Sequence, residues 1–457
     1  MPSDWTRRQL HQHLALGGLA WMAGCKGGDP ADTSVAPVVP RGVVLITADD
    51  LGWRDLSSYG LTAVQTPNLD RLVSEGVAFD RAFDVVSTCS SSRASLATGQ
   101  YPHTHGVTGL THRHPELSLP TDAPTLARTL RDHGLATALQ GKWHLSAEAP
   151  AASFGYDTAL ATDIDQRIRT VAPALDFLNA HADGGFFVEL NFMQTHRDLF
   201  DRFVQADGFP VSVDVAAPPE FWALPDLQGL REEVAGYLSQ LAWMDSLVGE
   251  VLGTLDALGL TDDVLVVFLS DNGPPFPGCK LTLYDRGVGT PLVFRWPAAL
   301  APRWETELVS TVQIAPTVLE LCAAPALPGA QGRSLAPLLR GEPWSPAEAV
   351  YSEMELHIDP LPCRAVRTAT HKYIRNLSSD PWGPGDGNAA YFEALADEPD
   401  QRWDEPRAPE ELYDLVSDPM ERVDLSGDPA HAGVLASLRA LLRSHAEATD
   451  DPRLAEL

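Results

Sequence analysis

Apolar runs alternate with amphipathic segments between about residues 41 and 340. Residues 43–48 and 264–269 are almost continuously apolar and rich in β-branched side chains, which is typical of strands buried on both faces. Two more strand-like runs occupy 136–139 and 186–192. Helices are expected after Thr66-Pro67, from Ala123-Pro124 to Gly134, and along an apolar stripe between Val234 and Leu258. This order predicts an α/β fold with a large, mostly parallel sheet flanked by helices.

The pattern changes beyond about residue 343. Short strand-like pieces separated by polar loops lie at 349–352, 365–368, 372–374 and 411–415, and a final helix is expected from about His431 to His445. This predicts a small C-terminal antiparallel sheet with one helix. We therefore predict a main domain over 41–345 and a smaller subdomain over 346–457.

The first 25 residues are typical of an export signal, with Arg7-Arg8 before an apolar run from Leu14 to Met22. The arginines resemble a twin-arginine signal, and residues 22–25 resemble a lipobox that would make Cys25 the lipidated first residue. Residues 26–40 then form a flexible tether. These features predict a periplasmic or cell-surface lipoprotein that reaches the membrane only through its lipid anchor. A plain signal peptide with an incidental cysteine is the alternative.

Polar side chains follow the two central strands. Asp49-Asp50 comes directly after one and Ser270-Asp271-Asn272 after the other. Ligands of open α/β sheets bind beyond the carboxyl ends of the strands, so these groups are expected to meet at one point. Clustered carboxylates need a cation to stay ionised, and oxygen ligands favour calcium or magnesium over zinc. Either segment taken alone is more often a solvated turn or a helix cap than a metal site.

A nucleophile and a fixed cation stand together in Cys89-Ser90-Ser91-Ser92-Arg93, at the start of an expected helix. A helix N-terminus attracts anions. Lys142 and His144 follow the strand at 136–139, His196 follows that at 186–192, and Lys280 comes shortly after Asn272. Around a metal, such groups would form an anion pocket with an acid and a base in reach.

The formal charge of −29 on 457 residues excludes a nucleic-acid-binding role, which requires a basic surface. The five cysteines are too few for a disulfide scaffold, although Cys279, Cys322 and Cys363 allow one bridge. Trp222, Trp382 and Trp403 stand in expected loops, where they either stack on sugar rings or serve as packing.

Together these segments resemble the sulfatase family. The motifs that carry the resemblance lie, in chain order, at 48–53, 66–70, 89–99, 101–107, 141–145, 270–273 and 412–415. It implies an alkaline-phosphatase-like fold and one calcium ion, with magnesium as the second choice. The implied ligands are Asp49, Asp50, Asp271, Asn272 and a formylglycine made from Cys89 by a formylglycine-generating enzyme.

The resemblance also implies a mechanism for hydrolysing a sulfate ester of a small molecule or carbohydrate. A hydroxyl of the hydrated formylglycine would attack sulfur with Arg93 beside it. Lys142, His196 and Lys280 would bind the sulfate oxygens and assist the leaving alcohol. His144 would take the proton of the second hydroxyl, so that sulfate leaves and the aldehyde returns.

The chain departs from the family pattern at several positions. Ser91 stands where proline is usual, Arg54 where a glycine is expected near Trp53, and Cys279 and Leu281 where glycines flank the lysine. Arg286 lies three positions from the usual place of the arginine in the segment 284–291. Two alternatives stay open: a phosphodiesterase or phosphonate monoester hydrolase of the same superfamily, and a non-catalytic metal-binding lipoprotein in which Cys89 is not converted.

Overall fold

The computed structural model describes residues 38–160, 166–198, 200, 202–381 and 405–457. The predicted export signal, Cys25 and most of the predicted tether lie outside these ranges, as do Trp382 and Trp403. Residues Val39–Leu457 form one compact unit. The boundary at 345 and 346 therefore stays a prediction. Among the described helices, none is both long and apolar enough to cross a membrane.

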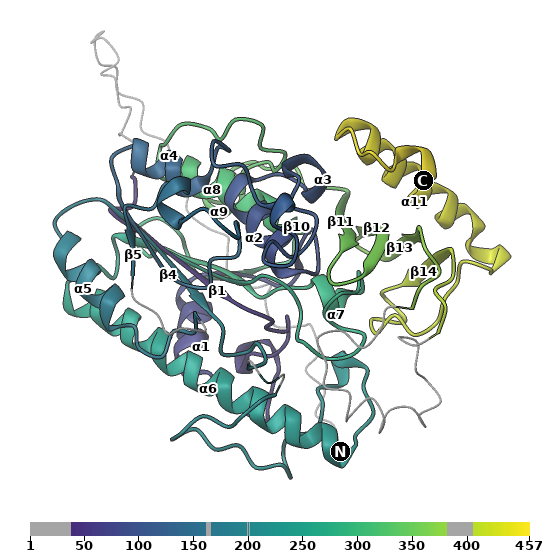
Figure 1. Cartoon of the computed structure of the whole chain (residues 1–457), viewed down its shortest axis with the longest axis horizontal. Coiled ribbons are helices and arrows are strands. Elements are labelled where there is room, and N and C mark those ends of the chain that lie inside the picture. Colours follow the sequence, from purple (N-terminus) through teal and green to yellow (C-terminus); the bar gives the residue numbers. More distant parts are fainter. Residues whose placement is uncertain (1–37, 161–165, 199, 201, 382–404) are drawn as a thin grey trace, which may run out of the picture. The chain divides into compact units, whose positions relative to one another are not determined.

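The main sheet has eight strands in the order β5-β4-β6-β1-β7-β8-β2-β9 (Figure 1). Neighbours from β5 to β7 are parallel, and β8 is antiparallel to both β7 and β2. The four strands predicted from the sequence are the consecutive central ones, β4, β6, β1 and β7, and their prediction is confirmed. The strands are β1 (Gly42–Ala48), β2 (Val77–Phe79), β4 (Ala136–Gly141), β5 (Thr158–Ala159), β6 (Phe186–Phe192), β7 (Val264–Ser270), β8 (Leu292–Arg295) and β9 (Arg303–Glu305). The short strands β3 (Ala82–Phe83) and β10 (Val309–Ser310) pair separately.

Helices cover both faces of this sheet, because alternate residues of β1 enter different apolar clusters. Val44 and Ile46 pack in the cluster of α1 and α6, whereas Val43 and Leu45 pack in that of α4 and α8. The helices of this region are α1 (Pro67–Glu75), α2 (Cys89–Thr98), α3 (Pro102–His105), α4 (Leu126–Asp132), α5 (Ala172–His181), α6 (Gln228–Ala257), α7 (Asp285–Val288), α8 (Ile314–Leu321) and α9 (Ala336–Leu339). Helix α4 begins two residues later than predicted because the Thr125 hydroxyl accepts from the amide of Arg128 at 3.2 Å and caps it.

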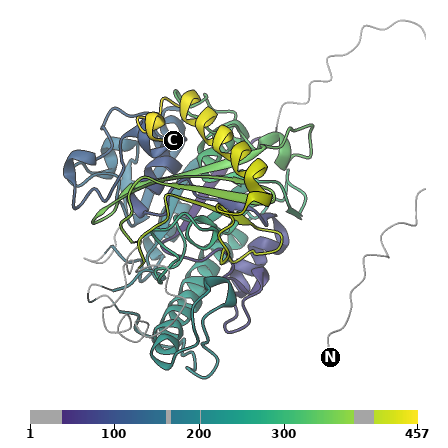
Figure 2. The same ribbon diagram turned by 90° about the vertical axis from the view of Figure 1, so that its right-hand side faces the viewer.

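The C-terminal region forms a four-stranded antiparallel sheet in the order β11-β12-β13-β14. Its elements are β11 (Ala349–Leu356), β12 (Pro360–Thr368), β13 (His371–Asn376), β14 (Glu410–Asp414) and α11 (Ala432–Ala448). Helix α11 lies over this sheet (Figure 2). Its residues Leu435, Leu438 and Leu442 belong to the same apolar cluster as the sheet's core side chains. The predicted sheet and final helix are thereby confirmed.

Hydrogen bonds and buried ion pairs connect the C-terminal sheet to the region of the main eight-stranded sheet. The amide of Glu353 in β11 donates to the Val85 carbonyl at 2.8 Å. Lys372 of β13 lies 2.5 Å from Asp285 of α7 and 3.1 Å from Glu421. The cationic neighbours Arg367 and Lys372 outweigh burial and hold the pKa of Asp285 at about 2.

The structure decides two questions that the sequence left open. Trp222 is 1% exposed and stacks on Phe276 with ring centroids 4.4 Å apart, so it is a packing residue and does not meet a sugar. The one disulfide that the cysteine count allowed is not formed. The four cysteines of the described ranges, Cys89, Cys279, Cys322 and Cys363, are all free thiols.

Candidate active site

The register of β1 against β7 brings the four metal-ligand candidates together. Ala48 pairs with Ser270, so the residues that follow each strand emerge side by side. The amide of Asp50 donates to Asp271 Oδ1 at 3.1 Å, and Asn272 Nδ2 donates to Asp50 Oδ1 at 2.7 Å. Asp50 has a φ of 62°, an uncommon left-handed conformation for a non-glycine residue. The predicted meeting of these groups at one sheet edge is confirmed.

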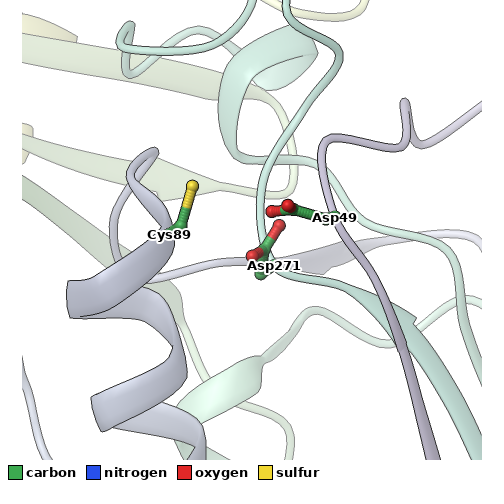
Figure 3. A group of neighbouring side chains, drawn as sticks. All are labelled: Asp49, Cys89 and Asp271. Carbon is green, nitrogen blue, oxygen red and sulfur yellow. The ribbon is translucent and has the colours of Figure 1, made fainter. Parts of the chain in front are cut away.

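Cys89 faces this cluster from the first turn of α2 (Figure 3). Its Sγ and one carboxylate oxygen each from Asp49 and Asp271 all lie within 4.8 Å of one another. All three side chains are at most 1% exposed. Burial raises the pKa of the Cys89 thiol to about 12, so the thiol is neutral at physiological pH in this environment.

Three buried cations compensate the three carboxylates. Lys142 Nζ lies 2.8 and 2.7 Å from the two oxygens of Asp49. Lys280 Nζ lies 2.9 Å from Asp50, and Arg93 Nη2 lies 2.8 Å from Asp271 Oδ2. Burial alone would raise the pKa of Asp49, but Lys142 and the further cations hold it well below its usual range. Burial raises the pKa of Asp271 to about 7, despite the opposing charge of Arg93.

The donor set fits a hard cation. Within the described residues, the buried oxygens Asp271 Oδ2 and Asn272 Oδ1 have no hydrogen-bond partner. Buried polar atoms are normally satisfied, so unsatisfied oxygens beside two further carboxylates point to a bound cation. Calcium binds carboxylate and amide oxygens in flexible geometry.

Two histidines complete the site. His196 Nε2 lies 3.8 Å from Asp50 Oδ2, and burial lowers the pKa of His196. His144 has a φ of 63°, and burial, followed by the charge of Lys142, lowers its pKa well below the usual value. Every candidate catalytic residue predicted from the sequence is thus in the same polar cluster or in electrostatic contact with it.

Other contacts at the site were not anticipated from the sequence. The Thr195 hydroxyl donates to the Asp49 carbonyl at 2.7 Å and fixes the backbone of a ligand candidate. His112 hydrogen-bonds to His144 at 2.9 Å. No signal in the sequence identifies His112 as an active-site residue, although it comes shortly after the motif at 101–107.

Of the departures from the family motifs, Arg54 and Arg286 make local contacts that account for their positions. Arg54 lies over the ring of Trp53 at 4.6 Å, and Arg286 donates to the carbonyls of Gly278 and Met420. Leu281 takes a φ of 71°, a conformation that suits the glycine expected there. Ser91 is fully buried, and its hydroxyl has no hydrogen-bond partner among the described residues.

A cavity of about 450 Å³ adjoins His196. Arg167, Arg169 and Arg202 line it together with Trp243, among others. Arg167 donates to the carbonyls of Gln194 and His196, and so braces the loop that carries His196. Asp198 and Asp207 also line the cavity, so the three arginines leave a small excess of positive charge there, which suits an anionic ligand.

Comparison with known proteins decides the family. The sulfatase family model matches residues 41–324, which is most of the chain and contains all the site residues above. The chain belongs to the sulfatase family. A second model, for the C-terminal region of N-sulphoglucosamine sulphohydrolase, matches residues 279–383 of this sulfatase.

Individual relatives agree with this assignment. The sulfatase is 30% identical to human N-sulphoglucosamine sulphohydrolase over 90% of this chain and 91% of the relative. A protein solved with its substrate D-glucosamine-2-N,6-O-disulfate has a TM-score of 0.68 at 19% identity, covering 91% of this chain and 99% of that one. The phosphonate monoester hydrolase of Silicibacter pomeroyi has the same TM-score at 20% identity, covering 90% and 96%. These two structures share the fold, which confirms the predicted alkaline-phosphatase-like class.

Proposed function

We propose that this sulfatase hydrolyses sulfate esters of carbohydrates through a formylglycine made from Cys89, with one calcium ion at the site. The observation that carries the proposal is the meeting of Cys89 with Asp49 and Asp271, surrounded by buried cations. Asp49, Asp50, Asp271 and Asn272 would hold the ion. When bound, the ion supplies a fixed positive charge that favours the ionised nucleophile.

The chain's own cations would bind the sulfuryl group. Lys142, Lys280 and Arg93 are held in place by carboxylates, so their charges are oriented before the substrate arrives. Preorganised charge of this kind stabilises the oxygens of a group in transfer better than water does. His196, beside the cavity, would assist the departing alcohol, and His144 would act as the base that regenerates the aldehyde.

A sulfated amino sugar is the substrate class that the relatives favour. One relative is named for N-sulphoglucosamine, and one structural neighbour was solved with a glucosamine disulfate. The arginine-lined cavity next to His196 would accept the anionic remainder of such a sugar. An exported enzyme anchored through Cys25 would meet such carbohydrates outside the cytoplasm.

The experiment that tests the proposal is mass spectrometry of the Cys89 peptide from protein expressed in its own host. Conversion of thiol to aldehyde lowers the peptide mass by about 18 units. The converted protein would then be assayed on O-sulfated and N-sulfated glucosamine and on a phosphonate monoester. An unmodified thiol throughout would refute the catalytic proposal and favour a metal-binding protein. Preferential phosphonate hydrolysis would favour the reaction of the Silicibacter relative.

A further inference from the structure

His144, the proposed base, is paired with a second histidine. Its Nε2 lies 2.9 Å from Nδ1 of His112, and the two rings have centroids 4.9 Å apart and planes 14° from parallel, so they meet edge to edge. The Thr111 hydroxyl donates to the His144 carbonyl at 3.1 Å and ties the two segments together. His112 is exposed.

The two nitrogens of His144 have different surroundings. Within the described chain, Nδ1 is buried and has no hydrogen-bond partner, while Nε2 faces His112. The charges acting on the ring include those of Lys142, Asp49 and Arg93, which places it in the active-site cluster. A base at Nδ1 needs its lone pair there, so the ring proton must stand on Nε2 and be donated to His112 Nδ1.

We propose that His112 is the second member of a two-histidine proton relay, which carries the proton taken up by His144 from the active site to solvent. The relay rests on the proposed formylglycine mechanism. Nδ1 of His144 is buried, whereas Nε2 faces the exposed His112, so the proton taken up while the active site is occupied has its shortest path to solvent through His112.

The relay begins at the second hydroxyl of residue 89 and ends at solvent. The O–H bond of the second hydroxyl on residue 89 breaks, its proton goes to His144 Nδ1, and its electron pair forms the aldehyde C=O bond. The bond from carbon to the sulfated oxygen breaks, and sulfate leaves with that pair. His144 then passes its Nε2 proton to His112 Nδ1, and His112 releases its own Nε2 proton to water. When sulfate has left and water enters to hydrate the aldehyde, His144 loses its Nδ1 proton to that water and regains one at Nε2 from His112 Nδ1. His112 takes a proton at Nε2 from solvent, and both rings are back in their starting tautomers.

The test compares His112→Ala and His112→Gln with wild type, using full-length protein in which conversion of residue 89 has been verified by mass. An aryl sulfate is the probe, because its phenol is released in the first step and the relay acts only in the second. We expect the burst of phenol to persist while steady-state kcat falls about tenfold or more. Acid-quenched protein should carry, on the peptide of residue 89, a mass about 80 units above that of the hydrated aldehyde.

Two further readouts separate proton transfer from support of the His144 ring. Added imidazole should restore turnover of His112→Ala. His112→Gln can keep a hydrogen bond to His144 but cannot relay a proton, so it should stay slow. His114→Ala is the matched control, because His114 lies two residues away and contacts Glu116 at 3.3 Å instead. Its kcat should equal that of wild type.

The outcomes are distinguishable. Turnover of both His112 variants within twofold of wild type would overturn the relay. So would a loss of kcat without sulfated enzyme and without imidazole rescue, because His112 would then only position His144. A wild-type protein that is converted at residue 89 and still inactive on sulfate esters would overturn the proposed function and the relay together.

Discussion

Arg93 Nη2 lies 2.8 Å from Asp271 Oδ2, yet within the described residues neither atom takes part in a hydrogen bond of regular geometry. Electrostatic attraction holds the two side chains together. Asp271 Oδ2 can therefore still accept a hydrogen bond or bind a cation. Burial also raises the pKa of Asp271 to about 7, so its ionised form needs further positive charge. A cation at the strand ends would supply it.

Asp271→Asn tests this site with little change of shape. We expect calcium affinity to fall about 100-fold or more, because a charged ligand is lost from a small oxygen cluster. The calcium-dependent rise in Tm should disappear, and the Tm of the metal-free variant should itself be lower because Arg93 loses its charged partner. Calorimetric titration with calcium and thermal unfolding would measure both. Asp132→Asn, at an exposed position, is the control. Unchanged calcium binding by Asp271→Asn would contradict the assigned ligand set.

Gly141→Ala should damage the strand end that carries Lys142. Gly141 has a φ of 100°, and a Cβ there would stand 2.1 Å from the Asn191 carbonyl oxygen. Gly134→Ala is the matched control, because its φ of 103° is similar and nothing lies within 4 Å of the added atom. We expect the control to lose only about 1 kcal/mol of unfolding free energy. Gly141→Ala should lose more than this and also most of its activity, because Lys142 shifts. Equal losses in the two variants would mean that the close approach to Asn191 is unimportant.

Lys372→Met should destabilise the fold without touching the active site. Lys372 is 1% exposed and lies between Asp285 and Glu421, so its removal leaves buried carboxylates without their lysine. Breaking a buried pair in this way costs about 3 kcal/mol or more. Denaturant unfolding would measure it. Arg443→Met, which breaks an exposed pair with Glu447, should change stability by less than about 0.5 kcal/mol.

Acidification should destabilise the protein through His105. Burial lowers its pKa to about 3, and its Nδ1 accepts from the Val107 amide at 3.1 Å. The unfolded state therefore binds more protons between pH 6.5 and 3, and this contribution to stability is complete above pH 6.5 and is lost as the pH falls. Between pH 7.5 and pH 5 the loss is about 2 kcal/mol. His105→Gln should show a smaller decrease by denaturant unfolding at the two pH values, whereas His114→Gln should behave as wild type. An undiminished decrease in His105→Gln would assign the acid sensitivity to other groups.

The sequence predicted the central fold because its signals there are local. Apolar runs mark β1 and β7, and both end in acidic or amide residues, so their pairing was enough to place Asp49, Asp50 and Asp271 together. The remaining strands on one side of the sheet, β8, β2 and β9, are short. Of these β8 runs antiparallel to both of its neighbours, and β2 pairs with β8 and β9 over long sequence separations, which periodicity does not report.

Side-chain pairing was harder to predict than strand order. Nothing in the spacing of His112 and His144 shows that their rings meet, because that contact depends on the left-handed backbone at His144 and on Thr111. Trp222 was open to two interpretations for the same reason. Its burial is decided by Phe276, Tyr237 and Asp55, which come from three separate segments.

The burial of Cys89 also limits when the proposed oxidation of its thiol can occur relative to folding. Its side chain is 1% exposed in the folded protein, at the N-terminus of a helix that packs under the ends of β1 and β7. A modifying enzyme cannot bind the segment around Cys89 once the sheet has formed. The proposed oxidation of this thiol would therefore have to precede folding, and a chain that folds first would keep its thiol.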